Sequence, residues 1–136
     1  DGQNITNYTS REGLSDNYVI SILEDSEGTI WLGTEGYGLN KFSKDTIISY
    51  GTKEGLSNNI IWSIVEDNNG ELWLGTEKGL NNLSIDDSLG VQVNSFDKLD
   101  GFKGSDFYPN SVCLYDENLI LWGTVKSLAM LDLNNY

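Results

Sequence analysis

Apolar and polar residues alternate in short stretches along this chain, and turn-forming residues separate the stretches. The first four stretches occupy residues 18–25, 29–34, 39–43 and 46–52. Ser26, Glu27 and Gly28 lie between the first two, where a tight turn would place Gly28 at a positive φ. Short alternating stretches broken by glycine-containing turns predict four consecutive antiparallel β-strands.

The pattern then repeats. Arg11–Ser43 and Lys53–Ser84 align with one deletion, and four residues recur 42 positions on: Gly13 at Gly55, Gly28 at Gly70, Trp31 at Trp73, and Gly33 at Gly75. The second set of predicted strands occupies residues 60–67, 71–76, 80–85 and 91–97. A period of about 40 to 45 residues built from short strands is typical of a β-propeller blade and not of a helical repeat.

A third, diverged unit follows, with predicted strands at residues 110–116, 119–124 and 127–133. Leu121 holds the place of Trp31 and Trp73, and Trp122 has moved one position along. Since successive strand residues point to opposite faces, this shift predicts that the third blade packs differently.

The predicted fold class is therefore all-β, with about three four-stranded antiparallel blades in one propeller segment, residues 1–136. Blade 1 is expected at 11–52, blade 2 at 53–98, and blade 3, lacking its outer strand, at 99–136. Residues 1–10 are interpreted as the outer strand of a preceding or closing blade. In particular, Asn4–Thr9 matches fourth strands, because Tyr8 lies 42 residues before Tyr50.

Three blades fall short of the roughly four to eight that closed propellers contain. Open blade faces and strand edges in water favour aggregation. The expected partner is therefore either a second copy, which completes a six-bladed ring with the outer strand donated in trans, or the remaining blades of a longer parent chain.

Charge and cysteine content narrow the possible functions. Twenty-one acidic against eight basic residues give a net charge of −13, which disfavours binding to nucleic acid or to an anionic membrane surface. Cys113 is the single cysteine, so no internal disulfide can form. It lies in the apolar stretch Val112-Cys113-Leu114, which predicts a buried, inert thiol.

Four motifs carry a family resemblance: GLS-(D/N)-N before the first strand, ED-x-x-G at the first turn, WLGT-E in the second strand and GLN in the third. Together they resemble the two-component regulator propeller repeat over two full repeats, and the third unit looks like a degenerate one. The resemblance implies the periplasmic sensor region of a hybrid two-component histidine kinase of gut bacteria, which typically detects breakdown products of complex polysaccharides. This segment would itself be non-enzymatic, and it contains no histidine.

The repeated aromatic and glycine positions are assigned to the structural blade core: Trp31, Trp73, Trp122, Gly33, Gly75 and Gly123. Recurrence at one strand position in each blade favours packing between blades over stacking on a sugar. Trp62 differs, because its counterpart in the first blade is Ile20. It is a candidate for the central channel, with core packing as the alternative.

No metal, cofactor or catalytic residue is predicted. Asp25 and Asp67 begin turns that could suggest calcium, but the twelve-residue calcium loop with its terminal Glu is absent. Glu24 and Asp25 are strand neighbours that point to opposite faces, which is poor geometry for an acid–base pair. A fragment of a propeller lyase would need clustered acids, a histidine or a metal in the channel, and is the least favoured alternative.

Ligand-binding candidates are residues in loops that converge on one rim of the ring, where crossovers between blades meet the loops joining second and third strands. Their amides, carboxylates and aromatic rings suit saccharides. They are Asn17, Tyr18, Glu35, Tyr37, Asn58, Asn59, Trp62, Phe107, Tyr108 and Asn110. For Asn17 and Asn59, which occupy equivalent positions, a purely turn-forming role is the alternative. For the whole segment, the alternative is a structural role in receptor assembly or dimerisation.

Overall fold

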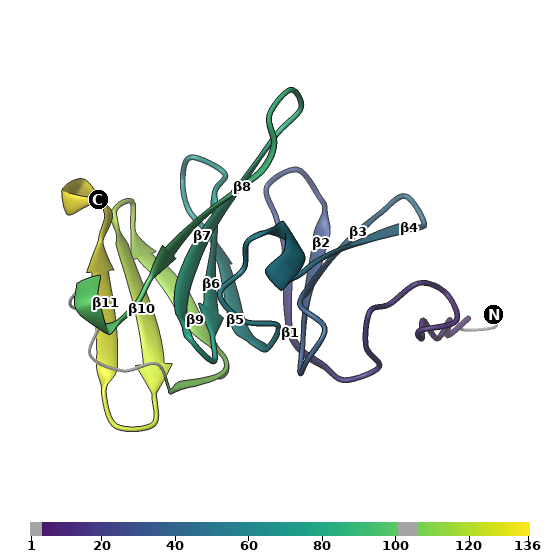
Figure 1. Ribbon diagram of the computed structural model, residues 1–136, viewed down its shortest axis with the longest axis horizontal. Coiled ribbons are helices and arrows are strands. Elements are labelled where there is room, and N and C mark those ends of the chain that lie inside the picture. The colour runs from purple at the N-terminus through teal and green to yellow at the C-terminus, as the bar shows by residue number, and fades with distance from the viewer. Residues whose placement is uncertain (1–3, 101–105) are drawn as a thin grey trace.

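The computed structural model describes residues 4–100 and 106–136, which form three antiparallel β-sheets arranged side by side (Figure 1). The first sheet, blade 1, contains β1 (Val19–Glu24), β2 (Ile30–Thr34), β3 (Leu39–Ser43) and β4 (Thr46–Tyr50). Blade 2 contains β5 (Ile61–Glu66), β6 (Leu72–Thr76), β7 (Gly79–Asp86) and β8 (Gly90–Phe96). Blade 3 contains β9 (Phe107–Asp116), β10 (Leu119–Thr124) and β11 (Leu128–Asp132).

Within each sheet the strands follow chain order, so strands that pair with each other are consecutive in the sequence. Short 3-10 helices at Thr52–Glu54, Lys98–Asp100 and Leu133–Asn135 lie in the connections. Gly28 and Gly70, in the first turns of blades 1 and 2, have φ values of +80° and +79°, as the sequence predicts. The all-β blade architecture predicted from the repeat is confirmed, and the sheets do not close into a ring.

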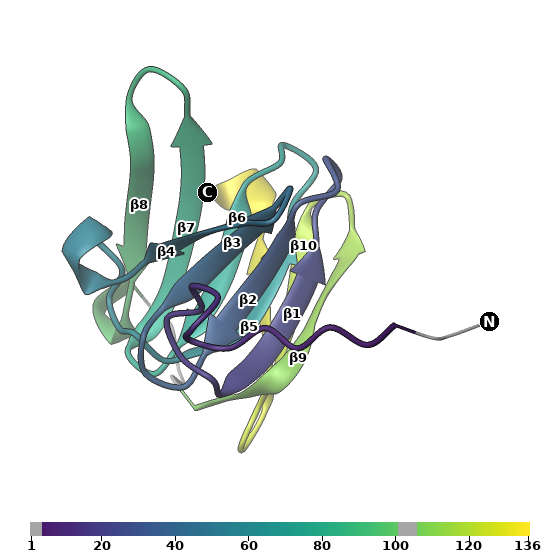
Figure 2. The same ribbon diagram turned by 90° about the vertical axis from the view of Figure 1, so that its right-hand side faces the viewer.

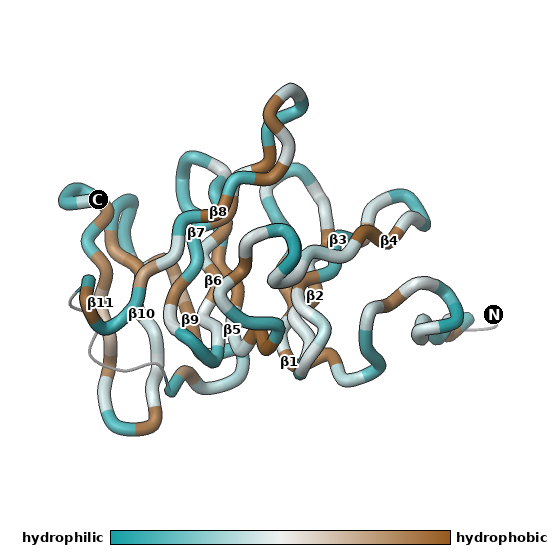
Figure 3. The backbone as a smooth tube through the Cα atoms, in the orientation of Figure 1, coloured by the Kyte–Doolittle hydropathy of each residue, from teal (hydrophilic) through white to brown (hydrophobic). Residues whose placement is uncertain are grey.

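The inner strands β1, β5 and β9 contact one another and gather on one side of the molecule, with β4 and β8 on the opposite side (Figure 2). Apolar residues recur along the strands of all three blades (Figure 3). Between blades 1 and 2 they form one core cluster that includes Trp31, Ile64 and Leu74. Between blades 2 and 3 they form a second cluster that includes Trp73 and Trp122. In blades 1 and 2, the face of the sheet that carries the tryptophan therefore packs on the following blade.

The repeated glycines bring neighbouring blades close together. A Cβ atom on Gly33 would lie 2.6 Å from the backbone oxygen of Ile61, on the inner strand of blade 2. A Cβ atom on Gly75 would lie 3.0 Å from the ring of Phe107, on the inner strand of blade 3. The absence of a side chain at these two positions lets each second strand approach the next blade.

Blade 3 differs where the sequence shift predicts. Trp122 is fully buried on the face toward blade 2, while Leu121, in the usual tryptophan place, pairs with Cys113 and Met130 on the other face. The prediction of a buried thiol is wrong: Cys113 is exposed. It lies on the outer face of blade 3, which no further blade of this chain covers.

The N-terminal segment forms no strand within this chain. Residues 4–9 match fourth strands in sequence but adopt no strand. Tyr8 packs edge-on against Phe42 at 5.0 Å between ring centroids and remains 42% exposed. A fourth strand forms by pairing with a third strand, and none among the described residues lies free beside this segment, so its interpretation as the outer strand of a preceding or closing blade stays a prediction. Within the described residues no helix is long and apolar enough to cross a membrane.

Candidate functional site

The ends of the strands form two rims, which Figure 1 shows at the bottom and the top of the sheets. The lower rim comprises the loops that join second and third strands, residues 35–38, 77–78 and 125–127, together with the crossovers that lead into β1 and β5. The upper rim comprises the turns after first strands, residues 25–29 and 67–71, and the hairpins at 44–45 and 87–89.

Backbone hydrogen bonds join the lower-rim segments of blade 1 to the crossover that enters blade 2. The amide of Glu35 donates to the carbonyl of Tyr18 at 3.1 Å, and the amide of Gly38 donates to the carbonyl of Asn59 at 2.7 Å. Glu35 also forms an isolated β-bridge with Ile60. As predicted from topology, the loop after the second strand and the crossover lie together.

A hollow of about 290 Å³, here called the Tyr37 hollow, opens at this junction. It is lined by Tyr37, Ser49, Tyr50, Gly51, Thr52, Lys53, Glu54 and Asn59. Tyr37 is 65% exposed, so its ring is an accessible aromatic surface. Two of the ten predicted ligand-binding residues, Tyr37 and Asn59, therefore line one hollow.

The polar groups of the hollow have defined hydrogen-bonding states. Asn59 Oδ1 accepts from the amide of Thr52 at 2.9 Å, which leaves its Nδ2 group as the donor. Glu54 Oε2 accepts from the amide of Gly51 at 2.6 Å. Burial first, and the Glu54 carboxylate second, raise the pKa of the Tyr50 hydroxyl above its usual value. This hydroxyl therefore stays protonated and able to donate.

Asn17 in blade 1 makes the same kind of hydrogen bond as Asn59 in blade 2. Its Oδ1 atom accepts from the amide of Ser10 at 2.8 Å, seven residues earlier, as Asn59 does from Thr52. Both asparagines thus brace a crossover through their side-chain oxygen. This is the turn-forming role named as the alternative for the pair, and for Asn59 it coexists with a place in the hollow.

Other predicted residues lie on the lower rim but outside the hollow. Tyr18 is 70% exposed, and Asn58 Oδ1 accepts from the amide of Ile60 at 2.8 Å. Trp62 is partly buried against the second core cluster, and its Nε1 donates to Glu77 Oε2 at 2.7 Å. Trp62 therefore has both a packed ring and a polar contact at the rim.

Blade 3 holds the remaining candidates. Phe107 is only 4% exposed and packs against Trp122 with 6.2 Å between ring centroids, so its assignment to ligand binding is wrong. It is a core residue, because β9 begins earlier than predicted and carries it between blades 2 and 3. Tyr108 is 53% exposed and Asn110 has a φ of +53°, both within β9. Neither lines the Tyr37 hollow.

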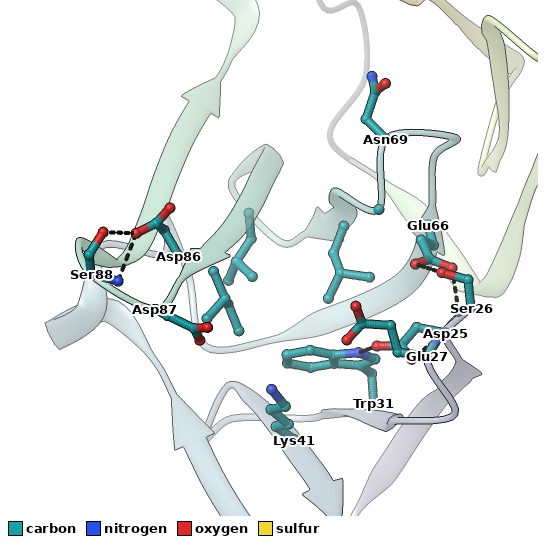
Figure 4. Close-up of a pocket in the computed structure, with 14 residues that line it drawn as sticks. Asp25, Ser26, Glu27, Trp31, Lys41, Glu66, Asn69, Asp86, Asp87 and Ser88 are labelled. Atoms are coloured by element: carbon teal, nitrogen blue, oxygen red, sulfur yellow. Dashed lines mark hydrogen bonds between the residues drawn. The ribbon is translucent and has the colours of Figure 1, made fainter.

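A larger cleft at the upper rim, of about 650 Å³, was missed by sequence reasoning. Figure 4 shows it between the first turn of blade 1 and the β7–β8 hairpin. Its lining includes five carboxylates and one ammonium group, from Asp25, Glu27, Glu66, Asp86, Asp87 and Lys41. Asp86 and Asp87 belong to the β7–β8 hairpin, which is longer than its counterpart in blade 1 and could have drawn attention to it.

Several groups of the upper cleft are already engaged. Trp31 is 3% exposed, and the ammonium of Lys41 lies 5.6 Å from its ring centroid. Glu66 accepts from both the amide and the hydroxyl of Ser26 at 2.7 Å. The Ser88 hydroxyl, then two backbone amides, lower the pKa of Asp86. The cleft is thus acidic and offers no free aromatic face.

Within residues 4–100 and 106–136, no group of three or more histidine, cysteine, aspartate or glutamate side chains could hold a metal ion. Asp25 and Asp67, which could suggest calcium in the sequence, use their carboxylates within their own turns and on their own tryptophans. These two carboxylates therefore stabilise the turns and tryptophans of the blades that carry them.

Two segments of the chain match a known protein family. Residues 13–36 and 55–78 match the family described as two component regulator propeller. The resemblance inferred from the motifs is confirmed, and the chain contains two repeats of this family, one in blade 1 and one in blade 2. No curated protein matches the chain.

Solved structures show the same fold. The chain resembles the extracellular domain assigned to the hybrid two component system BT3049 from B. thetaiotaomicron, with 23% identity and a TM-score of 0.63, over 94% of this chain and 23% of that one. It also resembles the extracellular domain of BT4673 from B. thetaiotaomicron, with 22% identity and a TM-score of 0.68, over 94% of this chain and 17% of that one. The chain spans less than a quarter of these proteins.

Proposed function

We propose that this segment is a non-enzymatic, ligand-sensing part of a hybrid two-component signalling protein, located in the periplasm and recognising saccharides derived from polysaccharides. The proposal is supported by the two family repeats and by a neighbour whose name describes the extracellular domain assigned to a hybrid two component system. The observation that carries the ligand assignment is the Tyr37 hollow, an accessible aromatic ring beside donors and acceptors at the junction of the two repeats.

The chemistry of the hollow suits a neutral sugar. The ring of Tyr37 offers a face on which the C–H side of a pyranose can stack. Lys53, the Asn59 amide and the Tyr50 hydroxyl supply donors, and Glu54 supplies acceptor oxygens. A volume of about 290 Å³ is at the lower end of the range for small-molecule sites, which fits one sugar ring with the rest of an oligosaccharide outside.

Signalling from such a site would not require chemistry within the segment. The hollow is walled by the β2–β3 loop of blade 1 and by the crossover into blade 2. A ligand that contacts both would favour one arrangement of these elements over another. The signal would then pass as a rigid-body change between propellers or between blades.

Isothermal titration calorimetry against a panel of oligosaccharides tests this proposal. We expect heat with at least one sugar, and we expect Tyr37→Ala to weaken that binding at least tenfold. Tyr18→Ala is the matched control, because Tyr18 is equally exposed on the same rim but lies outside the hollow. Heat from no sugar would favour the alternative, a structural segment that serves receptor assembly.

The alternative rests on a separate observation. Ile22, on the outer face of blade 1, is 59% exposed, whereas its repeat Ile64 is 4% exposed beneath blade 1. An apolar blade face that is open in one repeat and buried in the next indicates an assembly surface. This observation is compatible with sensing.

A further inference from the structure

The crossovers that lead into blades 1 and 2 share one hydrogen-bonding pattern, 42 residues apart. In the first, the amide of Thr9 donates to Glu12 Oε2 at 2.7 Å, and the amide of Glu12 donates to the carbonyl of Thr9 at 3.0 Å. In the second, the amide of Gly51 donates to Glu54 Oε2 at 2.6 Å, and the amide of Glu54 donates to the carbonyl of Gly51 at 3.0 Å. The first crossover therefore shows where the groups of a side chain at Gly51 would lie.

Threonine at the first position of the pattern places a hydroxyl group between two polar partners. Thr9 Oγ1 donates to Glu12 Oε2 at 2.6 Å and accepts from the amide of Arg11 at 3.2 Å. The crossover that follows blade 2 satisfies the equivalent amide in a similar way, because Asp97 Oδ1 accepts from the amide of Leu99 at 2.7 Å. In both crossovers the side chain at the first position thus accepts from the amide two residues later.

Gly51 supplies no such side chain in the crossover between blades 1 and 2. Within residues 4–100 and 106–136, Glu54 Oε2 accepts only from the amide of Gly51, and the amide of Lys53 donates to no acceptor. The backbone does not require glycine here, since a φ of −142° is extended and open to any residue. The carboxylate and the amide that correspond to the partners of the threonine hydroxyl therefore have no hydroxyl between them.

The space that a side chain would fill belongs to the Tyr37 hollow. A Cβ atom on Gly51 would lie 2.8 Å from Asn59 Oδ1 and 3.7 Å from Glu54 Oε2. The residues that line the hollow include Tyr37, Gly51, Lys53, Glu54 and Asn59. A hydroxyl group that enters from solvent can thus reach the same two partners while its sugar ring lies near the aromatic ring of Tyr37.

We propose that Gly51 creates a hydroxyl-binding position in the Tyr37 hollow, at which one hydroxyl of a saccharide lies where Thr9 Oγ1 lies in the first crossover. That hydroxyl donates to Glu54 Oε2 and accepts from the amide of Lys53. The inference rests on the proposed function, because it names the contact by which the hollow selects its sugar. A sugar substituted at this hydroxyl cannot donate, and a carboxylate in its place is repelled by Glu54. The position therefore selects an unsubstituted, uncharged sugar unit.

Unfolding of two variants tests the geometry without a sugar. Gly51→Thr supplies the hydroxyl, and the first crossover shows that threonine is compatible with this hydrogen-bonding pattern. Gly51→Val adds a β-branched side chain of similar shape without the hydroxyl. Gly51→Thr should therefore unfold at a higher urea concentration than Gly51→Val, since only threonine can make both hydrogen bonds. Equal midpoints, or a more stable Gly51→Val, would show that Glu54 and Lys53 do not hold a hydroxyl here and would overturn the proposal.

Isothermal titration calorimetry with xylotetraose, cellotetraose, mannotetraose and arabinotetraose tests the contact itself. The wild-type chain should bind at least one of these neutral sugars, and Gly51→Thr should weaken that binding by about tenfold or more, because its own hydroxyl occupies the position. Glu54→Gln should weaken it about tenfold, since a neutral acceptor holds a hydroxyl less strongly than a carboxylate does. Glu12→Gln is the matched control. It makes the same change in the first crossover, outside the hollow, and should leave binding unchanged.

Two results would contradict the proposal in different ways. Heat from none of the four sugars would contradict both the hydroxyl-binding position and the proposed function on which it rests. Binding that is lost in Tyr37→Ala but is equal in the wild-type chain, Gly51→Thr and Glu54→Gln would keep the hollow as the sugar site. It would overturn the hydroxyl-binding position alone.

Discussion

The carboxylate of Asp25 accepts a hydrogen bond from the indole Nε1 of Trp31 at 2.7 Å. Its other oxygen accepts from the amides of Glu27 and Thr29, which close the turn between β1 and β2. One side chain thus holds the turn and the tryptophan that packs on the next blade. Asp67 repeats the arrangement with Trp73 at 2.9 Å, which gives the aspartate of the ED-x-x-G motif a structural explanation.

Removing this carboxylate should destabilise blade 2. Asp67 is 6% exposed, so Asp67→Ala leaves the buried Nε1 of Trp73 and two turn amides without their acceptor. The expected loss in free energy of unfolding is about 1–3 kcal/mol. Urea denaturation followed by tryptophan fluorescence measures it. Asp87→Ala, at an exposed position of the β7–β8 hairpin, should change the midpoint little, and an equal loss in both variants would contradict the explanation.

Blade 3 shows why the shifted tryptophan could be predicted to pack differently, though not how. Trp122 is fully buried on the face toward blade 2, and its Nε1 has no hydrogen-bond partner in the described part of the chain. The aspartate–tryptophan pair of the first two blades has no equivalent here. The sequence shift predicts on which face of blade 3 Trp122 lies. It does not predict that the indole Nε1 group loses its acceptor, because this depends on how the neighbouring blades pack.

The glycine two residues after each repeated tryptophan, Gly33 or Gly75, should be intolerant of substitution for steric reasons. Gly33→Ala places a methyl group 2.6 Å from the carbonyl oxygen of Ile61, so the blades must separate. An overpacked interface typically costs about 1–3 kcal/mol. Gly28→Ala is the informative comparison. Gly28 has a φ of +80°, but no atom lies within 4 Å of the Cβ that the substitution adds.

Gly28→Ala should therefore cost only the backbone strain, about 1 kcal/mol. Gly33→Ala should lower the denaturation midpoint by more and should also increase exposure of the first core cluster to a hydrophobic dye. If Gly28→Ala proves the more damaging of the two, close approach of the blades is not the reason for the repeated glycine.

The strands and their order were predictable because one pattern recurs: the same turn, tryptophan and glycine reappear 42 residues apart. The errors concern residues whose environment depends on a neighbour. Cys113 lies in an apolar stretch, but its face has no blade over it. Asn4–Thr9 has the sequence of a fourth strand, but no third strand among the described residues pairs with it, so this interpretation stays a prediction.

The two candidate sites also differ in how far they could be predicted from the sequence. The Tyr37 hollow could be anticipated, because topology alone brings the β2–β3 loop to the crossover. The upper cleft could not, because it combines a turn of blade 1 with a hairpin about 60 residues later in blade 2. Phe107 was misplaced because a longer irregularity in β9 obscures its equivalence to Ile61: it pairs with Thr124 as Ile61 pairs with Thr76.

The titration of Glu12 should show whether the crossover before blade 1 is folded in solution, because this carboxylate accepts hydrogen bonds from Thr9 within it. The hydroxyl of Thr9 first, and its amide second, lower the pKa of this carboxyl below its ordinary 4.5. Because the folded-state pKa is depressed, the stabilisation is present above the unfolded value and is lost as the pH falls through the folded one. NMR titration of the side-chain carbon should thus give a midpoint below 4.5.

Thr9→Val removes the hydroxyl that donates to Glu12 at 2.6 Å and should move this midpoint back toward the ordinary value. Ser10→Ala should leave it in place, since Ser10 engages Asn17 through its backbone amide. An unshifted Glu12 in the wild-type chain would mean that the crossover is not formed in solution.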